Sequence, residues 1–274
     1  MRLIDVRHLG RERVIGCWQV GEVLIDPGPS SSLDGLLEGL GGSQPRALLL
    51  THIHLDHAGA AGTLVKRWPE LEVYVHEVGA PHLADPEKLL RSAARLYGDR
   101  MEELWGEVAP VPEQNLRALS GGEEVLGFRV AYTPGHASHH VSFLHSDSGR
   151  AFVGDVAGVR IPPCELMLPP TPPPDIDVEA WLRSIETVKE WQPQSLGITH
   201  FEAVDDPAGH LEMMRAELGA AAGLARELSE SEFERMLRAR MAACDEETEQ
   251  AYLQAMPPDQ HWAGLKRYWE KRAA

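Results

Sequence analysis

The stretch Thr51-His52-Ile53-His54-Leu55-Asp56-His57 decides how the rest of this chain is interpreted. It follows the apolar run 47–50, which predicts a short buried strand, and it precedes the helix-prone run 58–65, so we expect it in a strand-to-helix loop. In an extended segment alternate side chains point the same way, so His52 and His54 share a face, and the acid and histidine at the end follow on the turn. Imidazoles and a carboxylate at this density predict a site for zinc, iron or manganese.

Further polar residues follow short apolar runs later in the chain. Each stands where a β-prone run ends, and they are His136, Asp155 and His200. Loops at strand ends are where functional residues gather, so we expect these side chains to join the first stretch at one site.

At these residues the chain resembles the metallo-β-lactamase superfamily, whose pattern is H-x-H-x-D-H followed by a histidine, an aspartate and a histidine on successive strand ends. The resemblance runs from about residue 3 to residue 201 and is more specific for the fold than for the substrate. It implies an α+β fold, the four-layer αβ/βα sandwich, with the ligand set of the two-metal, glyoxalase II or lactonase-like members. The implied metal ligands are His52, His54, Asp56, His57, His136, Asp155 and His200.

The resemblance also divides these ligands between two divalent ions, with zinc expected and iron or manganese as alternatives. One ion is assigned to His52, His54 and His136, the other to Asp56, His57 and His200, and Asp155 bridges them. In this scheme a metal-bridging hydroxide attacks a small ester-like substrate. Asp56 is the implied catalytic residue, because it orients the hydroxide and can carry its proton to the leaving group.

Three more residues receive supporting roles. The segment around Asp26 is similar to the family's LIDTG segment, which makes Asp26 a group that orients ligands without binding metal. His140 matches a histidine that supports the loop in the family's GHTxGH run, whereas His139 stands where the family usually has glycine. Tyr97 is a candidate substrate contact, although packing of an amphipathic helix into the core is the simpler interpretation.

The composition limits the classes of binding partner that we expect. The 274 residues carry a formal charge of −16, which disfavours nucleic-acid and anionic membrane partners because phosphate binding needs clustered lysine and arginine. We find no basic leader with an apolar signal region and no apolar run that could span a bilayer, so a cytoplasmic protein with a small-molecule substrate is expected. Three cysteines, Cys17, Cys164 and Cys244, have no regular spacing, which also suits a reducing compartment.

The chain is expected to divide into a catalytic domain, residues 1–205, and a helical extension, residues 206–274, formed by three helices. Residues 79–118 are expected to form a helical lid inserted in the catalytic domain. Helical tails of family members bind substrate or form dimers, so a homodimer is one expectation. The proline-rich segment 162–174 is expected to be extended and exposed, as a wall of the site, a dimer contact or a rigid connector.

Several functions compete at this point. Hydrolysis of a lactone or a thioester leads, ahead of β-lactams and phosphodiesters, because the chain is acidic and shows no export signal. A mononuclear iron oxidoreductase of the persulfide dioxygenase kind shares the H-x-H-x-D-H loop but would leave His54, His57 or His200 without a full ligand role. A metal-stabilised binding protein without catalysis is the third class.

Overall fold

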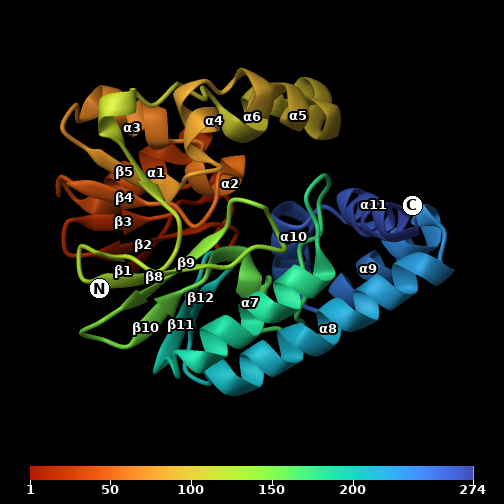
Figure 1. Ribbon diagram of the computed structural model, residues 1–274. Coiled ribbons are helices and arrows are strands. Elements are labelled where there is room, and N and C mark those ends of the chain that lie inside the picture. Colours follow the sequence, from red (N-terminus) through yellow and green to blue (C-terminus); the bar gives the residue numbers. More distant parts are fainter. Residues whose placement is uncertain (274) are drawn as a thin grey trace.

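The computed structural model describes residues 1–273 and contains two facing sheets of six strands each, with helices on both outer sides (Figure 1). The strand order is β1-β2-β3-β4-β5-β6 in the first sheet and β12-β11-β10-β9-β8-β7 in the second. This arrangement is the four-layer αβ/βα sandwich that the sequence predicts. The helical insertion and the helical extension are both present as additions to it.

The first sheet is built from the N-terminal part of the chain. Its strands are β1 (Arg2–Asp5), β2 (Gly16–Val20), β3 (Val23–Ile25), β4 (Ala47–Leu49), β5 (Glu72–His76) and β6 (Leu116–Leu119). Strands β3 to β6 run parallel, and β1 and β2 are antiparallel to their neighbours. The outer face is covered by α1 (Leu33–Leu40) and α3 (Ala61–Arg67), whose Leu36 and Leu64 share a core with Leu48. Strand β4 is apolar throughout because it is covered on both faces.

The second sheet follows in the chain and is mostly antiparallel. Its strands are β7 (Glu124–Val125), β8 (Phe128–Tyr132), β9 (Val141–His145), β10 (Arg150–Phe152), β11 (Ser195–Ile198) and β12 (Glu202–Val204). Only β10 and β11 pair in parallel, and the chain between them forms α7 (Val178–Glu190) on the outer face. Asp177 caps that helix by accepting a hydrogen bond from the backbone N–H of Ala180.

The inner faces of the two sheets share an apolar core. Trp18 and Leu49 from the first sheet pack in one cluster with Phe143 and Phe152 from the second. The indole N–H of Trp18 donates to the backbone oxygen of Ile198, 3.1 Å away, and so ties the sheets together. The strand ends that carry the predicted site are therefore held in a fixed relation.

The predicted lid is helical. It consists of α4 (Ala80–Ala84), α5 (Glu87–Tyr97) and α6 (Met101–Trp105), which follow α2 (Leu55–Ala58) and α3 along one side of the molecule (Figure 1). The predicted range, 79–118, extends too far, because its last residues belong to β6, which pairs in parallel with β5. Short 3₁₀ turns complete the catalytic part, namely η1 (His8–Gly10), η2 (Ser30–Ser32), η3 (Gly98–Arg100), η4 (Glu113–Asn115) and η5 (Gly154–Ala157).

The extension contains one helix more than predicted. Its helices are α8 (Pro207–Glu227), α9 (Glu230–Met241), α10 (Glu246–Ala255) and α11 (His261–Ala273), with the turn η6 (Pro258–Gln260) before the last. The prediction missed the break between α9 and α10, because alanines in that break are compatible with a helix. The signal is Asp245, whose carboxylate accepts from the N–H of Thr248 and caps α10. Within residues 1–273, no helix is both long and apolar enough to cross a membrane.

A disulfide between Cys164 and Cys244 joins the proline-rich segment to the extension. The argument from cysteine spacing to a reducing compartment is therefore wrong for this pair. The partners are 80 residues apart, and only the docking of the extension brings them together. The expectation that the proline-rich segment is exposed is also wrong in its central part, since Met167 and Leu168 are buried under the extension.

Reduction of this disulfide is expected to lower the free energy of unfolding by about 2–5 kcal/mol, because the bond closes a long loop and restricts the unfolded chain. Denaturant unfolding with and without dithiothreitol measures the effect. The double variant Cys164→Ala/Cys244→Ala is the control and should show no response to the reductant. A wild-type protein that unfolds at the same denaturant concentration in both conditions would show that the bond does not form.

Candidate metal centre

The predicted ligand residues meet at one edge of the sandwich. The H-x-H-x-D-H stretch leaves the end of β4, and His136 follows β8. Asp155 lies in η5 after β10, and His200 is the second residue after β11. All seven predicted ligands thus come from segments that follow strands, with Asp56 and His57 in the short helix α2, and their side chains approach one another.

Three histidines form the first cluster. The Nδ1 atom of His54 lies 3.0 Å from Nε2 of His52 and 2.9 Å from Nε2 of His136. These three nitrogens belong to one group of ligand atoms within 4.8 Å of one another, which is the size of a site for one ion. His52 and His136 are buried and His54 is partly exposed, and both His54 and His136 line the pocket.

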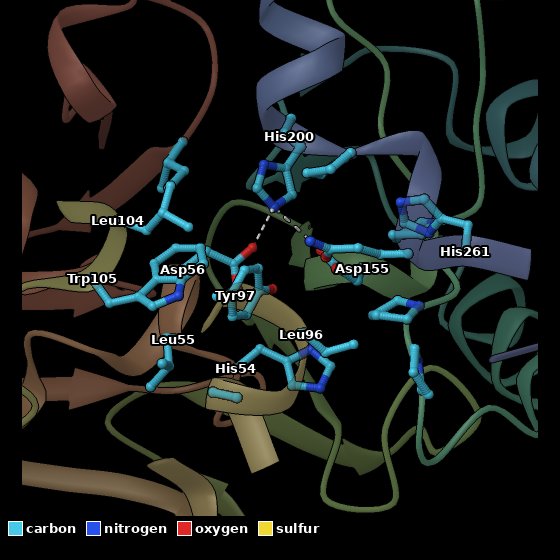
Figure 2. Close-up of a pocket in the computed structure, with 18 of the residues that line it drawn as sticks. His54, Leu55, Asp56, Leu96, Tyr97, Leu104, Trp105, Asp155, His200 and His261 are labelled. Atoms are coloured by element: carbon cyan, nitrogen blue, oxygen red, sulfur yellow. Dashed lines mark ion pairs between the residues drawn. The ribbon is translucent and has the colours of Figure 1, made fainter. Parts of the chain in front are cut away.

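Asp56, His57 and His200 form the second cluster, and Figure 2 shows the ion pair between Asp56 and His200. The Oδ2 atom of Asp56 lies 3.3 Å from Nε2 of His200 and 3.7 Å from Nε2 of His57. Both histidines are buried, but the Asp56 side chain keeps 23% of its surface exposed. This carboxylate is therefore accessible from the pocket.

Asp155 lies between the clusters. Its Oδ2 atom is 3.3 Å from Nε2 of His136 in the first cluster, and its Oδ1 atom is 3.2 Å from Nε2 of His57 in the second. Oδ1 of Asp155 and Nε2 of His57 are buried and have no hydrogen-bond partner. Unpaired buried polar atoms are costly, so their arrangement around a common centre fits a divalent cation.

The opposite nitrogen of each buried ligand histidine is held by an oxygen of the chain. His136 Nδ1 donates to the backbone oxygen of Pro170 at 2.9 Å, and His200 Nδ1 donates to that of Val14 at 2.6 Å. These acceptors place the proton on Nδ1, which leaves the lone pair of Nε2 facing the cluster.

Asp26 sets the same tautomer in the two remaining histidines. Its carboxylate accepts from Nδ1 of His57 at 2.8 Å and from the hydroxyl of Thr51 at 2.7 Å. Because the Thr51 hydroxyl donates its only proton to Asp26, it must accept from Nδ1 of His52, 3.0 Å away. Asp26 also accepts from the hydroxyl of Thr199 at 3.1 Å and is 1% exposed. It thus lies in the position predicted for a residue that orients ligands.

His140 lies beside the first cluster and not within it. Its Nδ1 atom is 2.9 Å from the Thr133 hydroxyl, and its ring centroid is 5.0 Å from that of His52. It belongs to none of the ligand groups found among residues 1–273. His139 is buried at the pocket wall, where its Nδ1 accepts from the N–H of Ile53 at 3.4 Å.

Burial and neighbouring charges shift the histidine pKa values of the two clusters in opposite directions. Burial, with repulsion from neighbouring histidines, holds the pKa of His52 well below its usual range and lowers that of His54 to about 4. Burial also disfavours the charged form of His57, but the carboxylates of Asp155, Asp56 and Asp26 outweigh it and raise the His57 pKa well above its usual range. In the metal-free protein the second cluster therefore holds protons that a cation would replace.

A cavity of about 770 Å³ opens over the clusters. The lid contributes Tyr97, Leu104 and Trp105 to its wall, with Tyr97 packed edge-on against Trp105 (Figure 2). The proline-rich segment and the extension form the other sides, the latter through residues such as His261. Tyr97 therefore lies in the pocket, as predicted, and it also packs as a core residue does.

Two pocket residues were missed by the sequence analysis. His8 is buried, stacks parallel to Trp105 with ring centroids 5.6 Å apart, and places Nδ1 3.0 Å from the Ser32 hydroxyl. Ser32 stands at the start of α1, but its hydroxyl does not cap that helix. His261 was assigned to the extension without a role. No sequence motif marks either histidine, because each reaches the pocket only through tertiary packing.

A family model described as the metallo-beta-lactamase superfamily matches residues 21–191. The chain belongs to this superfamily. Its members are mostly metal-dependent hydrolases, and the His and Asp clusters described above are suited to divalent metal binding. The predicted fold family is thereby confirmed.

Individual superfamily members resemble the chain over different lengths. The metallo-beta-lactamase fold-containing protein ST1585 of Sulfurisphaera tokodaii is 31% identical over 193 residues, which are 67% of this chain and 70% of that protein. The crystal structure of ST1585 covers 80% of this chain and 85% of its own, at 26% identity and a TM-score of 0.64. The di-iron-bound form of TTHA1623 is 29% identical, with a TM-score of 0.54, over 70% of this chain and 89% of that structure.

A hydroxyacylglutathione hydrolase of Xylella fastidiosa strain M12 is 33% identical over 134 residues, or 48% of this chain. The matched segment spans 40% of that hydrolase, so the chain covers less than half of its length.

Replacing Asp26 tests whether its hydrogen bonds orient the metal ligands. Asp26→Ala leaves several buried donors unpaired, so we expect metal affinity to fall by about 10–100-fold and the metal-free protein to lose about 3–5 kcal/mol of stability. Asp26→Asn keeps an acceptor and tolerates the positive φ of 50° at this position, so its losses should be smaller. Chelator competition and denaturant unfolding measure the two quantities. Equal metal affinity in wild type and Asp26→Ala would contradict the assigned role.

His8 predicts a dependence of stability on pH. Burial lowers its pKa to about 4, from 6.5, so between these values the unfolded chain binds a proton that the folded chain does not. Stability should therefore fall as the pH falls through this window, by at most about 1.4 kcal/mol per pH unit from this group. Unfolding of the wild type and of His8→Asn, compared from pH 7 to pH 4, isolates the contribution. A difference between the two proteins that stays constant with pH would refute it.

Proposed function

We propose that this chain is a hydrolase that uses two divalent ions, with zinc expected, and that opens the ester-like bond of a small lactone or thioester. The observation that carries the proposal is the position of Asp155, whose two oxygens each lie within 3.3 Å of a ligand nitrogen of a different cluster. A carboxylate in this position is suited to hold two cations close together. The di-iron-bound form of TTHA1623 supports the same metal number.

The residues around the clusters supply the remaining functions. When bound, the ions would lower the pKa of water toward neutrality and polarise the substrate carbonyl. Asp56 is the cluster carboxylate exposed to the pocket, with 23% of its side-chain surface open against 5% for Asp155. We therefore assign proton transfer to the leaving group to Asp56, while Asp155 positions ligands.

The pocket wall supports an acyl substrate. The lid side is formed by Leu55, Ala93, Leu104 and Trp105, which make one apolar cluster beside the metal centre. Prolines of the proline-rich segment form another apolar side. We propose that the acyl part of the substrate lies between them, with Tyr97 in contact. The match to a hydroxyacylglutathione hydrolase is consistent with a thioester.

The alternative hypothesis, an iron oxidoreductase, requires only one metal ion, held by two histidines and one aspartate. The second complete group of ligand atoms would then have no purpose, so the two-metal hydrolase explains more of the site. The proposal of a small-molecule substrate rests on the cavity of about 770 Å³ over the clusters.

Asp155→Ala is expected to reduce metal content to one ion or none per chain and to lower hydrolysis by at least about 100-fold, because both sites lose a ligand. Elemental analysis of protein purified without chelator gives the metal content, and a panel of lactones and thioesters gives the activity. Asp259→Ala is the matched control, since Asp259 lines the pocket outside the clusters.

Two ions per wild-type chain together with turnover of a panel ester would support the proposal. Unchanged metal content in Asp155→Ala would contradict the bridging role. A wild type that holds a single iron after metal supplementation would favour the oxidoreductase instead.

A further inference from the structure

The extension holds the segment that follows Asp155, residues 157–174, at several points. His210 Nε2 donates to the backbone oxygen of Ala157 at 2.8 Å. The hydroxyl of Tyr252 accepts from the N–H of Ile161 at 2.8 Å and donates to the backbone oxygen of Leu166. The disulfide adds a covalent link to the same segment. The contact at Ile161 lies next to Arg160, whose N–H donates to the backbone oxygen of His200 at 2.7 Å. None of these contacts lies next to a residue that holds the ring nitrogen of a metal ligand.

His261, the first residue of α11, makes a different contact. Its Nδ1 atom accepts from the backbone N–H of Thr171 at 2.8 Å, and its backbone oxygen accepts from the Thr171 hydroxyl at 3.0 Å. The side chain is 3% exposed, and burial lowers its pKa to about 3, so it is neutral at ordinary pH. A neutral imidazole that accepts at Nδ1 carries its proton on Nε2, so the bond from the Thr171 N–H fixes the tautomer of His261.

The backbone of α11 also packs against the same point. A Cβ atom at Gly264 would lie 2.1 Å from the backbone oxygen of Thr171, so only glycine allows this approach. Thr171 is therefore fixed by the two hydrogen bonds that it donates to His261 and by direct contact with Gly264, in the next turn of the helix.

The residue before Thr171 contacts the metal centre. The backbone oxygen of Pro170 accepts from Nδ1 of His136, at 2.9 Å. The Nε2 atom of the same ring faces Nδ1 of His54 and Oδ2 of Asp155. Trp181 also packs edge-on against the His136 ring, with centroids 5.2 Å apart, but an apolar contact does not choose which ring nitrogen carries the proton. The orientation and the tautomer of His136 thus depend on the Pro170 oxygen.

We propose that His261 is a positioning residue of the metal centre. Through Thr171 it fixes the Pro170 oxygen, which fixes His136 and so sets the affinity of the cluster formed with His52 and His54. The proposal deepens the proposed function and rests on its metal-binding part. It gives the extension a role in the affinity of one metal site.

The pair His261→Leu and His261→Asn tests this route. The Asn oxygen can take the place of Nδ1 as acceptor, whereas Leu has a similar volume and no acceptor. We expect His261→Leu to weaken one of the two sites by about 10–100-fold, and His261→Asn to stay within about threefold of wild type. Chelator competition with Zn²⁺ measures both affinities, and the absorption spectrum of the Co²⁺-loaded protein reports the ligand geometry of the weakened site.

Tyr252→Phe is the matched control. It removes hydrogen bonds between the same extension and the same segment, but at Ile161 and Leu166, away from Pro170. Both metal affinities should remain at the wild-type value in this variant. Circular dichroism of the metal-free variants shows whether each one folds. If His261→Leu does not fold, Thr171→Val, which removes only the hydroxyl bond to His261, replaces it and should weaken the same site by a smaller factor.

The outcomes separate the two proposals. Equal affinities in wild type and a folded His261→Leu, or in wild type and Thr171→Val where it is the substitute, would overturn the role of His261. A loss in Tyr252→Phe as large as that in His261→Leu would also overturn it, because docking of the extension would then be the cause. Wild-type metal binding without hydrolysis of any panel ester would contradict only the proposed function. A wild type that binds no metal would contradict both.

Discussion

The buried carboxylate of Asp26 is the interaction on which the metal centre depends. It lies just after β3, accepts the Thr51 N–H and hydroxyl after β4, and accepts the Thr199 hydroxyl after β11, so it joins strand ends from both sheets. Its remaining contact is with His57. A charge in this position is tolerated because every neighbour donates to it. The same group therefore closes the sandwich at this edge and orients the ligands.

The histidines of the site are prepared for metal before any metal binds. His52, His57, His136 and His200 all have Nδ1 held by an oxygen of the chain, so the Nε2 atom of each ring faces the clusters. His54 differs, because Nδ1 is the atom that faces its cluster. Outer hydrogen bonds of this kind fix ring orientation and raise the basicity of the ligand.

The sequence predicts most of what lies at strand ends and little of what depends on distant packing. Short apolar runs predict the strand ends that carry His136, Asp155 and His200, and the resemblance to the metallo-β-lactamase superfamily implies that these residues join the H-x-H-x-D-H stretch at one metal site. The helix break before Asp245 was missed, since a single capping residue marks it. The disulfide and the contact of His261 with Thr171 join residues 80 and 90 positions apart, and no local pattern records where the extension docks.

The cavity has a thermodynamic consequence. Its volume of about 770 Å³ leaves room for many water molecules. Much of the wall that these molecules contact is leucine, tryptophan and proline, and an acyl group that enters would displace them from apolar surface. Removal of apolar surface from water gives a negative heat capacity of binding. Substrate affinity in this pocket should therefore carry the temperature dependence of hydrophobic association, although the chemistry beneath it is that of charged groups.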